Sequence, residues 1–410
     1  MAAASNKPWI IVGLLWLAYF VNYLDRQVVF SILPVLQKEL HFTNAQLGLI
    51  GSIFIWVYSL ACPPAGRLAD RFRREWLAPA SLVLWSVATL ATGLSRSVES
   101  FLFWRGIMGV TEGLYFPAAV SVIAAVHPGA TRSRAISLHG TAQFAGIAAG
   151  GWFGGWMAEG WGWRWGFVVL AALGIAYAPL LRLGLGNLPA AAPSGLTRAS
   201  TPGDVFAARC YWALALAFFA LCAMLWMLYA WLPNFIYERY GLSLAESGFT
   251  ATLYLQAGSA AGILAGGAIG DRLTRRLAPG RFYVAALGLL LCAPLAYFTV
   301  AVRSLSLLTA ASAGFGFFAG LMMSNTVASA YDVIAASNYG FGAGALTMIG
   351  GLAGGLAIFS VGKWKESVGV EPLMALGSLT AGLAALLLAA VVAKQFQADR
   401  RRAGIELTPG

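Results

Sequence analysis

Twelve long apolar runs constrain the fold of this 410-residue chain more than any other feature of its sequence. A helix that spans a membrane needs about 20 consecutive apolar residues, and each run reaches that length. The first six runs fall at about 9–36, 44–69, 76–95, 101–126, 135–158 and 164–186. The other six fall at about 210–236, 245–270, 281–301, 305–331, 337–361 and 371–395. The pattern predicts an all-α membrane protein with twelve transmembrane helices in two sets of six.

The composition excludes the main alternatives to a membrane protein. Only 10% of the residues are charged and 59% are hydrophobic, whereas a soluble domain has about 25% charged residues. An ordinary soluble enzyme or a disordered chain is therefore excluded. The net charge of +11 does not indicate nucleic-acid binding, because its basic residues follow the membrane topology.

Most of the 27 lysines and arginines fall in segments that the twelve runs place on one side of the membrane, whereas the acidic residues divide evenly. Basic residues concentrate on the cytoplasmic side of membrane proteins. We therefore expect both termini to be cytoplasmic. We also expect a multi-pass protein of the plasma (inner) membrane.

The two sets of runs are related by an internal repeat of about 200 residues. Three short patterns recur at this spacing: Gly66-x-x-x-Asp70-Arg71-x-x-Arg74 as Gly267-x-x-x-Asp271-Arg272-x-x-Arg275, Gly150-Gly151-x-x-Gly154-Gly155 as Gly350-Gly351-x-x-Gly354-Gly355, and Leu33-Pro34 as Leu232-Pro233. Such a duplication is typical of two-bundle transporters that bind substrate near the membrane midplane. We expect these parts: an N-terminal bundle at 1–186, a cytoplasmic linker at 187–209, a C-terminal bundle at 210–395 and a cytoplasmic tail at 396–410.

The repeated loop motif is a candidate gating element. Its residues are Gly66, Asp70 and Arg71 in the first copy, and Asp271 and Arg272 in the second. The glycine allows close helix packing, and the aspartate can pair with a basic residue or with a helix N-terminus. The alternative is an ordinary basic stop at the cytoplasmic face, which the recurrence of the motif disfavours.

This loop resembles the signature loop of the major facilitator superfamily, and the layout of six plus six spans extends the resemblance over the whole chain. The chain departs from the usual signature at Arg73, where the family has glycine. The resemblance implies two pseudo-symmetric six-helix bundles.

Four charged residues lie near the middle of their spans. Asp25 and Arg26 are in the first span, and Arg105 and Glu112 are in the fourth. A charge at the bilayer centre costs about 2.5–3.5 kcal/mol, so we expect the four to face a wet cavity and to pair with one another. Arg105 and Glu112 share one helix face about 10 Å apart, which excludes direct contact between them. The set is either a proton and substrate-charge relay, which we favour, or a structural cluster.

The surrounding motifs carry a closer resemblance. They are Asn22-Tyr23-Leu24-Asp25-Arg26, Arg105-x-x-x-Gly109-x-x-Glu112-x-x-x-Phe116-Pro117, Gly162-Trp163-Arg164-Trp165 and Trp231-Leu232-Pro233. Together they are similar to the anion:cation symporter family, which includes bacterial sugar-acid transporters. A Spinster-like branch shares the Asp-Arg pair and the Arg/Glu pair, so the choice between the two branches stays open.

The resemblance implies roles for individual residues. Asp25 and Glu112 correspond to protonatable carboxylates, and Arg105 to the arginine that partners the coupling acid. Arg26 corresponds to a substrate-binding arginine, and its planar guanidinium suits a carboxylate. The polar positions of the sugar-acid site correspond to Tyr23, Tyr58 and Gln143. For Tyr58 and Gln143 the alternative is hydrogen bonding between helices.

The second half of the chain has no acid or base at mid-depth of a span. Its polar candidates include Asn325, which we assign to substrate binding. In the fifth span, a series of glycines resembles the antiporter motif of drug exchangers, although close helix packing is the simpler interpretation. His139 near the start of that span is interpreted as a helix-end residue.

We therefore expect an alternating-access secondary transporter, a proton-coupled symporter of a small organic anion such as a sugar acid or a monocarboxylate. The alternative is a Spinster-like or drug-type proton-coupled exporter of an amphiphilic lipid or drug. A receptor or an intramembrane enzyme is disfavoured, because no nucleophile with a base is visible at midspan. We expect the organic anion, the proton and the lipid bilayer as partners, no nucleic acid, no cofactor, no metal site and a monomeric protein.

Overall fold

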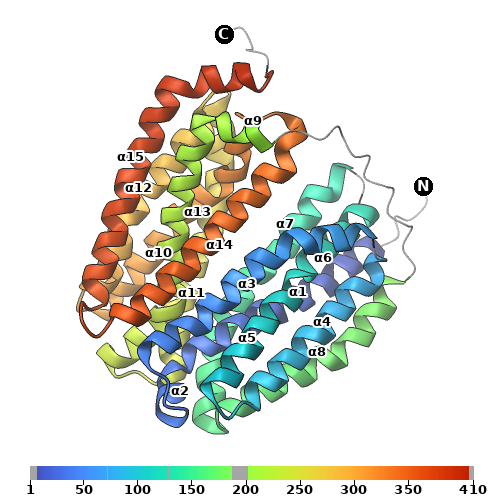
Figure 1. The fold of residues 1–410 in the computed structure, drawn as a ribbon, viewed down its shortest axis with the longest axis vertical. Coiled ribbons are helices and arrows are strands. Elements are labelled where there is room, and N and C mark those ends of the chain that lie inside the picture. Colours follow the sequence, from blue (N-terminus) through green and yellow to red (C-terminus); the bar gives the residue numbers. More distant parts are fainter. Residues whose placement is uncertain (1–6, 72, 128, 187–201, 406–410) are drawn as a thin grey trace. The chain divides into compact units, whose positions relative to one another are not determined.

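The computed structural model describes residues 7–71, 73–127, 129–186 and 202–405, and every regular element in that part of the chain is a helix (Figure 1). The helices are α1 (Lys7–Ser31), α2 (Leu33–Glu39), α3 (Asn44–Arg71), α4 (Arg74–Gly93), α5 (Val98–Gly113), α6 (Tyr115–Val126), α7 (Gly129–Gly160), α8 (Trp163–Leu185), α9 (Pro202–Ala207), α10 (Arg209–Tyr240), α11 (Leu244–Thr274), α12 (Gly280–Ala301), α13 (Leu305–Tyr331), η1 (Ala336–Asn338), α14 (Tyr339–Trp364) and α15 (Val370–Arg402).

Eleven helical segments of the described chain are long and apolar enough to cross a membrane. The remaining predicted span, 135–158, lies within α7, a helix of 32 residues whose many glycines dilute its apolar character. The prediction of an all-helical membrane protein is confirmed.

Two of the predicted spans are interrupted helices. The first span breaks at Ile32, between α1 and α2, and the fourth breaks at Leu114, between α5 and α6. Pro34 and Pro117 follow these breaks. Proline lacks the backbone N–H that would bond to the carbonyl four residues earlier, and its ring also crowds that carbonyl. The second break places Glu112 in the last turn of α5, beside the interruption.

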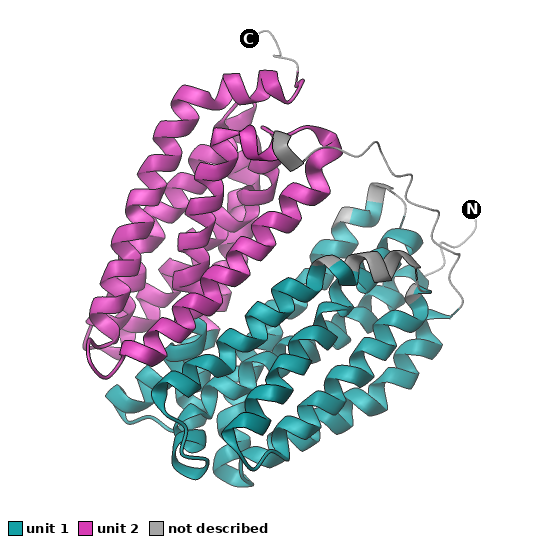
Figure 2. Ribbon diagram, in the orientation of Figure 1, with its two compact units in different colours: residues 1–194, 229–252 teal, residues 195–228, 253–410 magenta. Residues whose placement is uncertain are grey.

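The helices cluster into two compact units (Figure 2). The first unit comprises residues 1–194 and 229–252, and the second comprises 195–228 and 253–410. This division follows the predicted bundles except at 229–252, which belongs to the first unit.

The predicted linker and tail differ from the helix boundaries. Residues 187–201 of the linker and 406–410 of the tail lie outside the described residues. The linker ends in a short helix, α9, and α15 continues past the predicted span end at 395 to Arg402.

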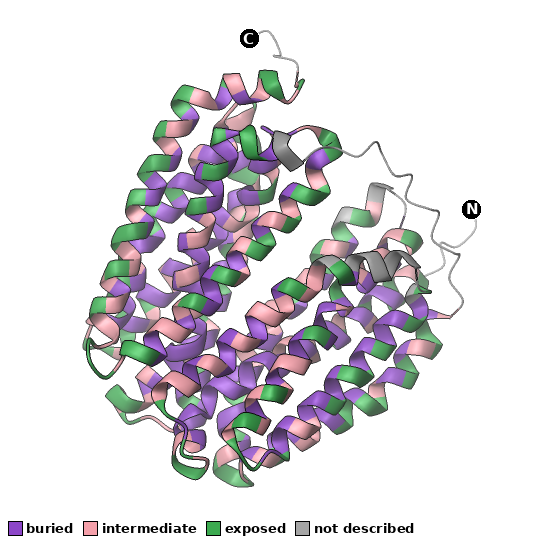
Figure 3. Ribbon diagram, in the orientation of Figure 1, coloured by how far each residue is buried: buried purple, intermediate pink, exposed green. Residues whose placement is uncertain are grey.

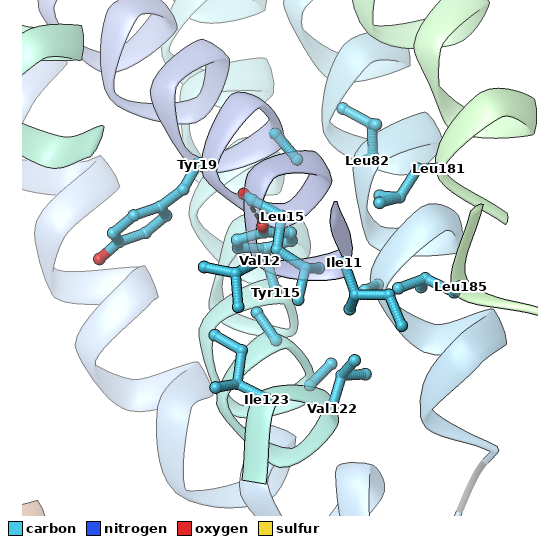
Figure 4. Close-up of a cluster of buried hydrophobic side chains, with 14 of the residues drawn as sticks. Ile11, Val12, Leu15, Tyr19, Leu82, Tyr115, Val122, Ile123, Leu181 and Leu185 are labelled. Atoms are coloured by element: carbon cyan, nitrogen blue, oxygen red, sulfur yellow. Dashed lines mark hydrogen bonds between the residues drawn. The ribbon is translucent and has the colours of Figure 1, made fainter. Parts of the chain in front are cut away.

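In the first unit, three pairs of helices pack along each other: α1 with α7, α3 with α5, and α4 with α8. A cluster of buried apolar side chains from α1, α4, α6, α7 and α8 fills one end of the unit, with Leu15, Leu82 and Tyr115 among its fully buried members (Figure 4). This core fixes α1, the helix that carries Asp25 and Arg26.

Glycines bring α7 against the backbone of α1. A β-carbon at Gly146 would lie 2.6 Å from the carbonyl oxygen of Phe20, and one at Gly150 would lie 2.5 Å from that of Leu24. Larger side chains would therefore force the two helices apart. The interpretation of the fifth-span glycines as packing residues agrees with this geometry.

In the second unit, α12 packs against both α13 and α15. Exposed residues line much of α15 (Figure 3), and many of them are leucines, including Leu376, Leu379, Leu383 and Leu386. An apolar exposed surface of this kind suits contact with lipid.

Candidate functional site

The four mid-span charges lie in the first unit, where α1 and α5 bring them together. Nε of Arg26 donates a hydrogen bond of 2.5 Å to Oε2 of Glu112. The two side chains are 8% and 0% exposed. A bond between a guanidinium and a carboxylate is charge-assisted and therefore strong. The expected pairing between the first and fourth spans is thus present as an Arg26–Glu112 ion pair.

The Asp25 carboxylate is buried next to this pair. Its Oδ2 accepts a hydrogen bond from the hydroxyl of Thr89 on α4. The carboxylate also interacts electrostatically with Glu112 and with both arginines. Two acids and two bases therefore form one coupled set whose formal charges cancel.

Aromatic rings surround the guanidinium of Arg26. Its Cζ lies 4.4 Å from the ring centroid of Tyr58, 4.6 Å from that of Tyr23 and 5.1 Å from that of Phe54. Phe54 also faces Arg105, whose Cζ is 4.9 Å from the ring centroid. The negative faces of these rings stabilise a cation that has left water. Tyr23 and Tyr58 are only half-buried.

Arg105 is fully buried, and its Nη1 donates a hydrogen bond of 3.1 Å to Sδ of Met108. Within the described part of the chain, its Nε and Nη2 have no hydrogen-bond partner. The same holds there for Oδ1 of Asp25 and Oε1 of Glu112. Because buried polar atoms are normally satisfied, this set keeps unused donors and acceptors for another polar group.

Gly109 explains how α3 reaches this cluster. A β-carbon at Gly109 would lie 2.7 Å from the carbonyl oxygen of Phe54 and 3.0 Å from the amide nitrogen of Tyr58. The absent side chain lets α5 approach the α3 backbone closely. The motif Arg105-x-x-x-Gly109-x-x-Glu112 thus contains two charges and the packing position between them.

The other two predicted substrate residues are placed differently. Gln143 is half-buried on α7, the helix that packs along α1. Asn325 belongs to α13 in the second unit, where its Nδ2 donates to the carbonyls of Gly266 and Leu321, each at 2.9 Å. The bond to Gly266 ties α13 to α11, the bond to Leu321 lies within α13, and together they use both amide hydrogens. A role of Asn325 in substrate binding would therefore fall to Oδ1 alone.

The two copies of the gating motif are described to different extents. The side chains of Gly66, Asp70 and Arg71 lie outside the described residues, although the helical backbone of α3 extends through them. In the second copy, Asp271 pairs with Arg281 on α12 at 2.7 Å, while Arg272 is exposed.

Arg281 also contacts Asp332, which follows α13, at 3.3 Å. Burial raises the pKa of Asp332 above its usual value, and Arg281 offsets this effect only in part. The second copy of the motif is therefore linked to two neighbouring helix ends within its own unit.

The interpretation of His139 as a helix-end residue is wrong. Helix α7 begins at Gly129, so His139 lies almost three turns inside it and is fully buried. Its ring stacks on Tyr19 with centroids 4.5 Å apart. The helix extends into the polar segment that precedes the apolar run at 135–158, so the apolar run alone does not mark where the helix begins.

Three residues of the cluster were not predicted from the sequence: Thr89, Phe54 and Met108. Thr89 carries a single hydroxyl in an apolar span, where such a group usually bonds to its own helix, and its Oγ1 also lies within hydrogen-bond distance, 3.0 Å, of the carbonyl oxygen of Trp85. Phe54 precedes Tyr58 by four residues on the same face of α3, and this spacing was the available signal.

Comparisons with known proteins agree with this architecture. The model of the Major Facilitator Superfamily matches residues 15–358. The D-galactonate transporter of Escherichia coli O6:H1 is 24% identical over 300 residues, which cover 67% of this chain and 70% of that protein. The probable sulfoacetate transporter SauU of Cupriavidus necator is 27% identical over 408 residues, covering 90% of each chain.

A solved structure has the same fold. The crystal structure of a bacterial homologue of the human lysosomal transporter Spinster, inward-facing and unoccupied, superposes with a TM-score of 0.78 at 20% identity and covers 100% of both chains. The family match spans well over half of the sequence, and the related proteins are transporters. This chain belongs to the Major Facilitator Superfamily and is a membrane transporter.

Proposed function

We propose that the protein is a secondary active transporter that couples proton movement to the symport of a small organic anion, such as a sugar acid or a monocarboxylate. The observation that carries the proposal is the buried Arg26–Glu112 ion pair, next to Asp25 and surrounded by aromatic rings. A structural ion pair alone would not need a second carboxylate and a second arginine with unused hydrogen-bonding atoms.

The substrate class follows from the chemistry of Arg26. A guanidinium binds a carboxylate through two parallel hydrogen bonds, and the half-buried Tyr23 and Tyr58 add hydroxyl groups beside it. Gln143 on the adjacent helix would add an amide. The names of two relatives, a D-galactonate transporter and a probable sulfoacetate transporter, both refer to small organic anions.

Proton coupling follows from the balance of charge. A proton on Glu112 or Asp25 leaves the cluster with one excess positive charge, which a substrate carboxylate neutralises. Protonation of Glu112 also weakens its bond to Arg26, which then becomes free to bind the substrate. When the proton and the anion leave, the carboxylate pairs with the arginine again. Arg105 remains charged throughout and stabilises whichever acid is ionised.

The remaining assignments belong to the same proposal. The N-terminal bundle at 1–186 carries the coupling residues, and the bundle at 210–395 contributes shape and a few hydrogen bonds. The loop motifs around Asp70 and Asp271 hold and release the gates during alternating access. The transporter works as a monomer in the plasma (inner) membrane with both termini in the cytoplasm.

Uptake into proteoliposomes tests the proposal. Radiolabelled galactonate, other sugar acids and monocarboxylates are offered with and without an inward proton gradient. We expect one of these anions to accumulate against its gradient only when protons enter, and Glu112→Gln to abolish the accumulation. The proposal fails if no organic anion accumulates, and if Glu112→Gln behaves like the wild-type protein in proton uptake.

The alternative is proton-coupled export of an amphiphilic lipid or drug. It is favoured by the second half of the chain, which has no acid or base at mid-depth of its spans. Export predicts that an amphiphile drives proton entry as it leaves the vesicle. The same proteoliposomes, loaded with lysolipid and monitored with a pH-sensitive dye, distinguish the two directions.

A further inference from the structure

Two adjoining cavities form a groove between α10 and α15 in the second unit. One, of about 510 Å³, lies at the start of α10 and the end of α15, and the other, of about 420 Å³, lies deeper along the same helices. Leu216 and Leu387 line both cavities, so the groove is continuous.

The end of the groove nearest the predicted cytoplasmic face is basic. Arg209 and Lys394 line the first cavity from opposite helices, and both are exposed. In the described part of the chain neither side chain takes part in an ion pair. Trp212, 45% exposed, lies beside them and donates to the carbonyl of Phe206 at 3.0 Å. Tryptophan is typical of the level of lipid headgroups.

The deeper part of the groove is almost entirely apolar. It is lined by Phe219, Ala220, Ala223, Leu383 and Ala384, together with Gly377 and Thr380. Arg209 and Ala223 are fourteen residues apart on one helix, a rise of about 21 Å. Half of the hydrocarbon core of a bilayer is about 15 Å thick, so the groove reaches from a headgroup through one leaflet.

We propose that this groove is a binding site for an anionic phospholipid of the cytoplasmic leaflet. The phosphate lies between Arg209 and Lys394, Trp212 packs at the glycerol level, and an acyl chain follows the apolar part of the groove. Charge complementarity selects the occupant, because two unpaired cations at a lipid-facing surface attract an anionic headgroup. The site is separate from the Arg26–Glu112 cluster and belongs to the other unit.

Native mass spectrometry of the purified, full-length transporter tests this assignment. The protein is mixed in detergent with phosphatidylglycerol, and the fraction carrying one bound lipid is measured. Because each basic residue contributes a factor of about five to anionic-lipid affinity, we expect the double variant Arg209→Gln/Lys394→Gln to bind about 25-fold more weakly. The variant Ala223→Phe, which fills the apolar cavity, also weakens binding while both charges remain.

The matched control is Arg276→Gln/Arg401→Gln, which removes two exposed charges of the second unit that do not line the groove. It is expected to bind phosphatidylglycerol like the wild type. Phosphatidylcholine is expected to bind weakly, and equimolar inorganic phosphate is expected not to displace the lipid.

Equal loss in both double variants, equal binding of the two lipids, or displacement by phosphate would each overturn the proposal. Size-exclusion elution and thermal unfolding without lipid verify that every variant compared is folded.

Discussion

One ion pair in each unit of this transporter joins two helices at a predicted functional motif, and the two pairs differ in burial. In the first unit, Arg26 and Glu112 pair where their side chains are 8% and 0% exposed. In the second, Arg281 and Asp271 pair at helix ends, with side chains 27% and 62% exposed. The same chemical contact is thus placed in the apolar interior of one unit and near water in the other.

The difference in burial changes what each pair can do. A buried charge that loses its partner is strongly unfavourable, so protonation of Glu112 must be compensated by rearrangement or by a new anion. An exposed ion pair contributes little to the stability of the folded protein, because water solvates a charge that has lost its partner. In the proposed mechanism, the first pair therefore couples two ligands, whereas the second acts only as a weak latch.

Removing the acid from each pair gives the largest contrast. Glu112→Ala leaves a buried guanidinium that cannot lose its proton, and we expect it to destabilise the protein by about 3–5 kcal/mol. Asp271→Ala leaves Arg281 partly exposed and still 3.3 Å from Asp332, so we expect a loss below about 1 kcal/mol. Denaturant unfolding of the two variants measures both losses. Equal losses would remove the distinction between the units.

The hydroxyl of Thr89 tests the buried cluster more selectively. Thr89→Val keeps the shape of the side chain but removes the donor to Asp25. Hydrogen bonds to charged groups contribute about 1.5–3 kcal/mol, so we expect proton-driven uptake to fall about tenfold or more.

The control for Thr89 lies in the second unit. Among the residues that the structure describes, Thr326 on α13 donates only to the carbonyl of Met322 in its own helix, at 2.8 Å, and Thr326→Val is expected to leave uptake nearly unchanged. Thr89→Ser should retain most of the activity. If both valine variants transport equally, the bond to Asp25 has no part in coupling.

The packing that assembles the cluster gives a smaller, structural effect. In Gly109→Ala, the new methyl group meets backbone atoms of α3 at 2.7 and 3.0 Å, whereas in Gly106→Ala it meets only Ile53 side-chain carbons at 3.8 Å. Overpacking costs about 1–3 kcal/mol, so we expect Gly109→Ala to lower both stability and uptake. Gly106→Ala should change neither. Thermal unfolding and uptake of both variants test this expectation.

Much of the fold could be predicted from the sequence because the membrane restricts the choices. Apolar runs of span length form helices in a membrane. Because unpaired charges inside the bilayer are costly, the four mid-span charges were expected to pair with one another. The partners of those charges could not be predicted. Whether Arg26 meets Asp25, Glu112 or both depends on the rotation of α1 against α5, which the spacing of residues within each helix does not determine. The helix breaks near Pro34 and Pro117 could not be predicted either. A proline within a span does not always interrupt the helix, since Pro233 lies within the unbroken α10.

The smallest expected effect concerns the pH dependence of the second unit. Because burial raises the pKa of Asp332, the folded protein binds a proton there more readily than the unfolded chain does. Stability should therefore increase as the pH falls from 7 toward the usual range of an aspartate, in line with proton linkage. Asp332→Asn removes this contribution, so the wild-type protein should gain stability relative to the variant on acidification, by less than about 1 kcal/mol for so exposed a pair. Thermal unfolding of both proteins at several pH values measures the difference. A relative loss of wild-type stability at low pH would mean that pairing with Arg281 outweighs burial, and the weak latch of the second unit would then resemble the buried pair of the first.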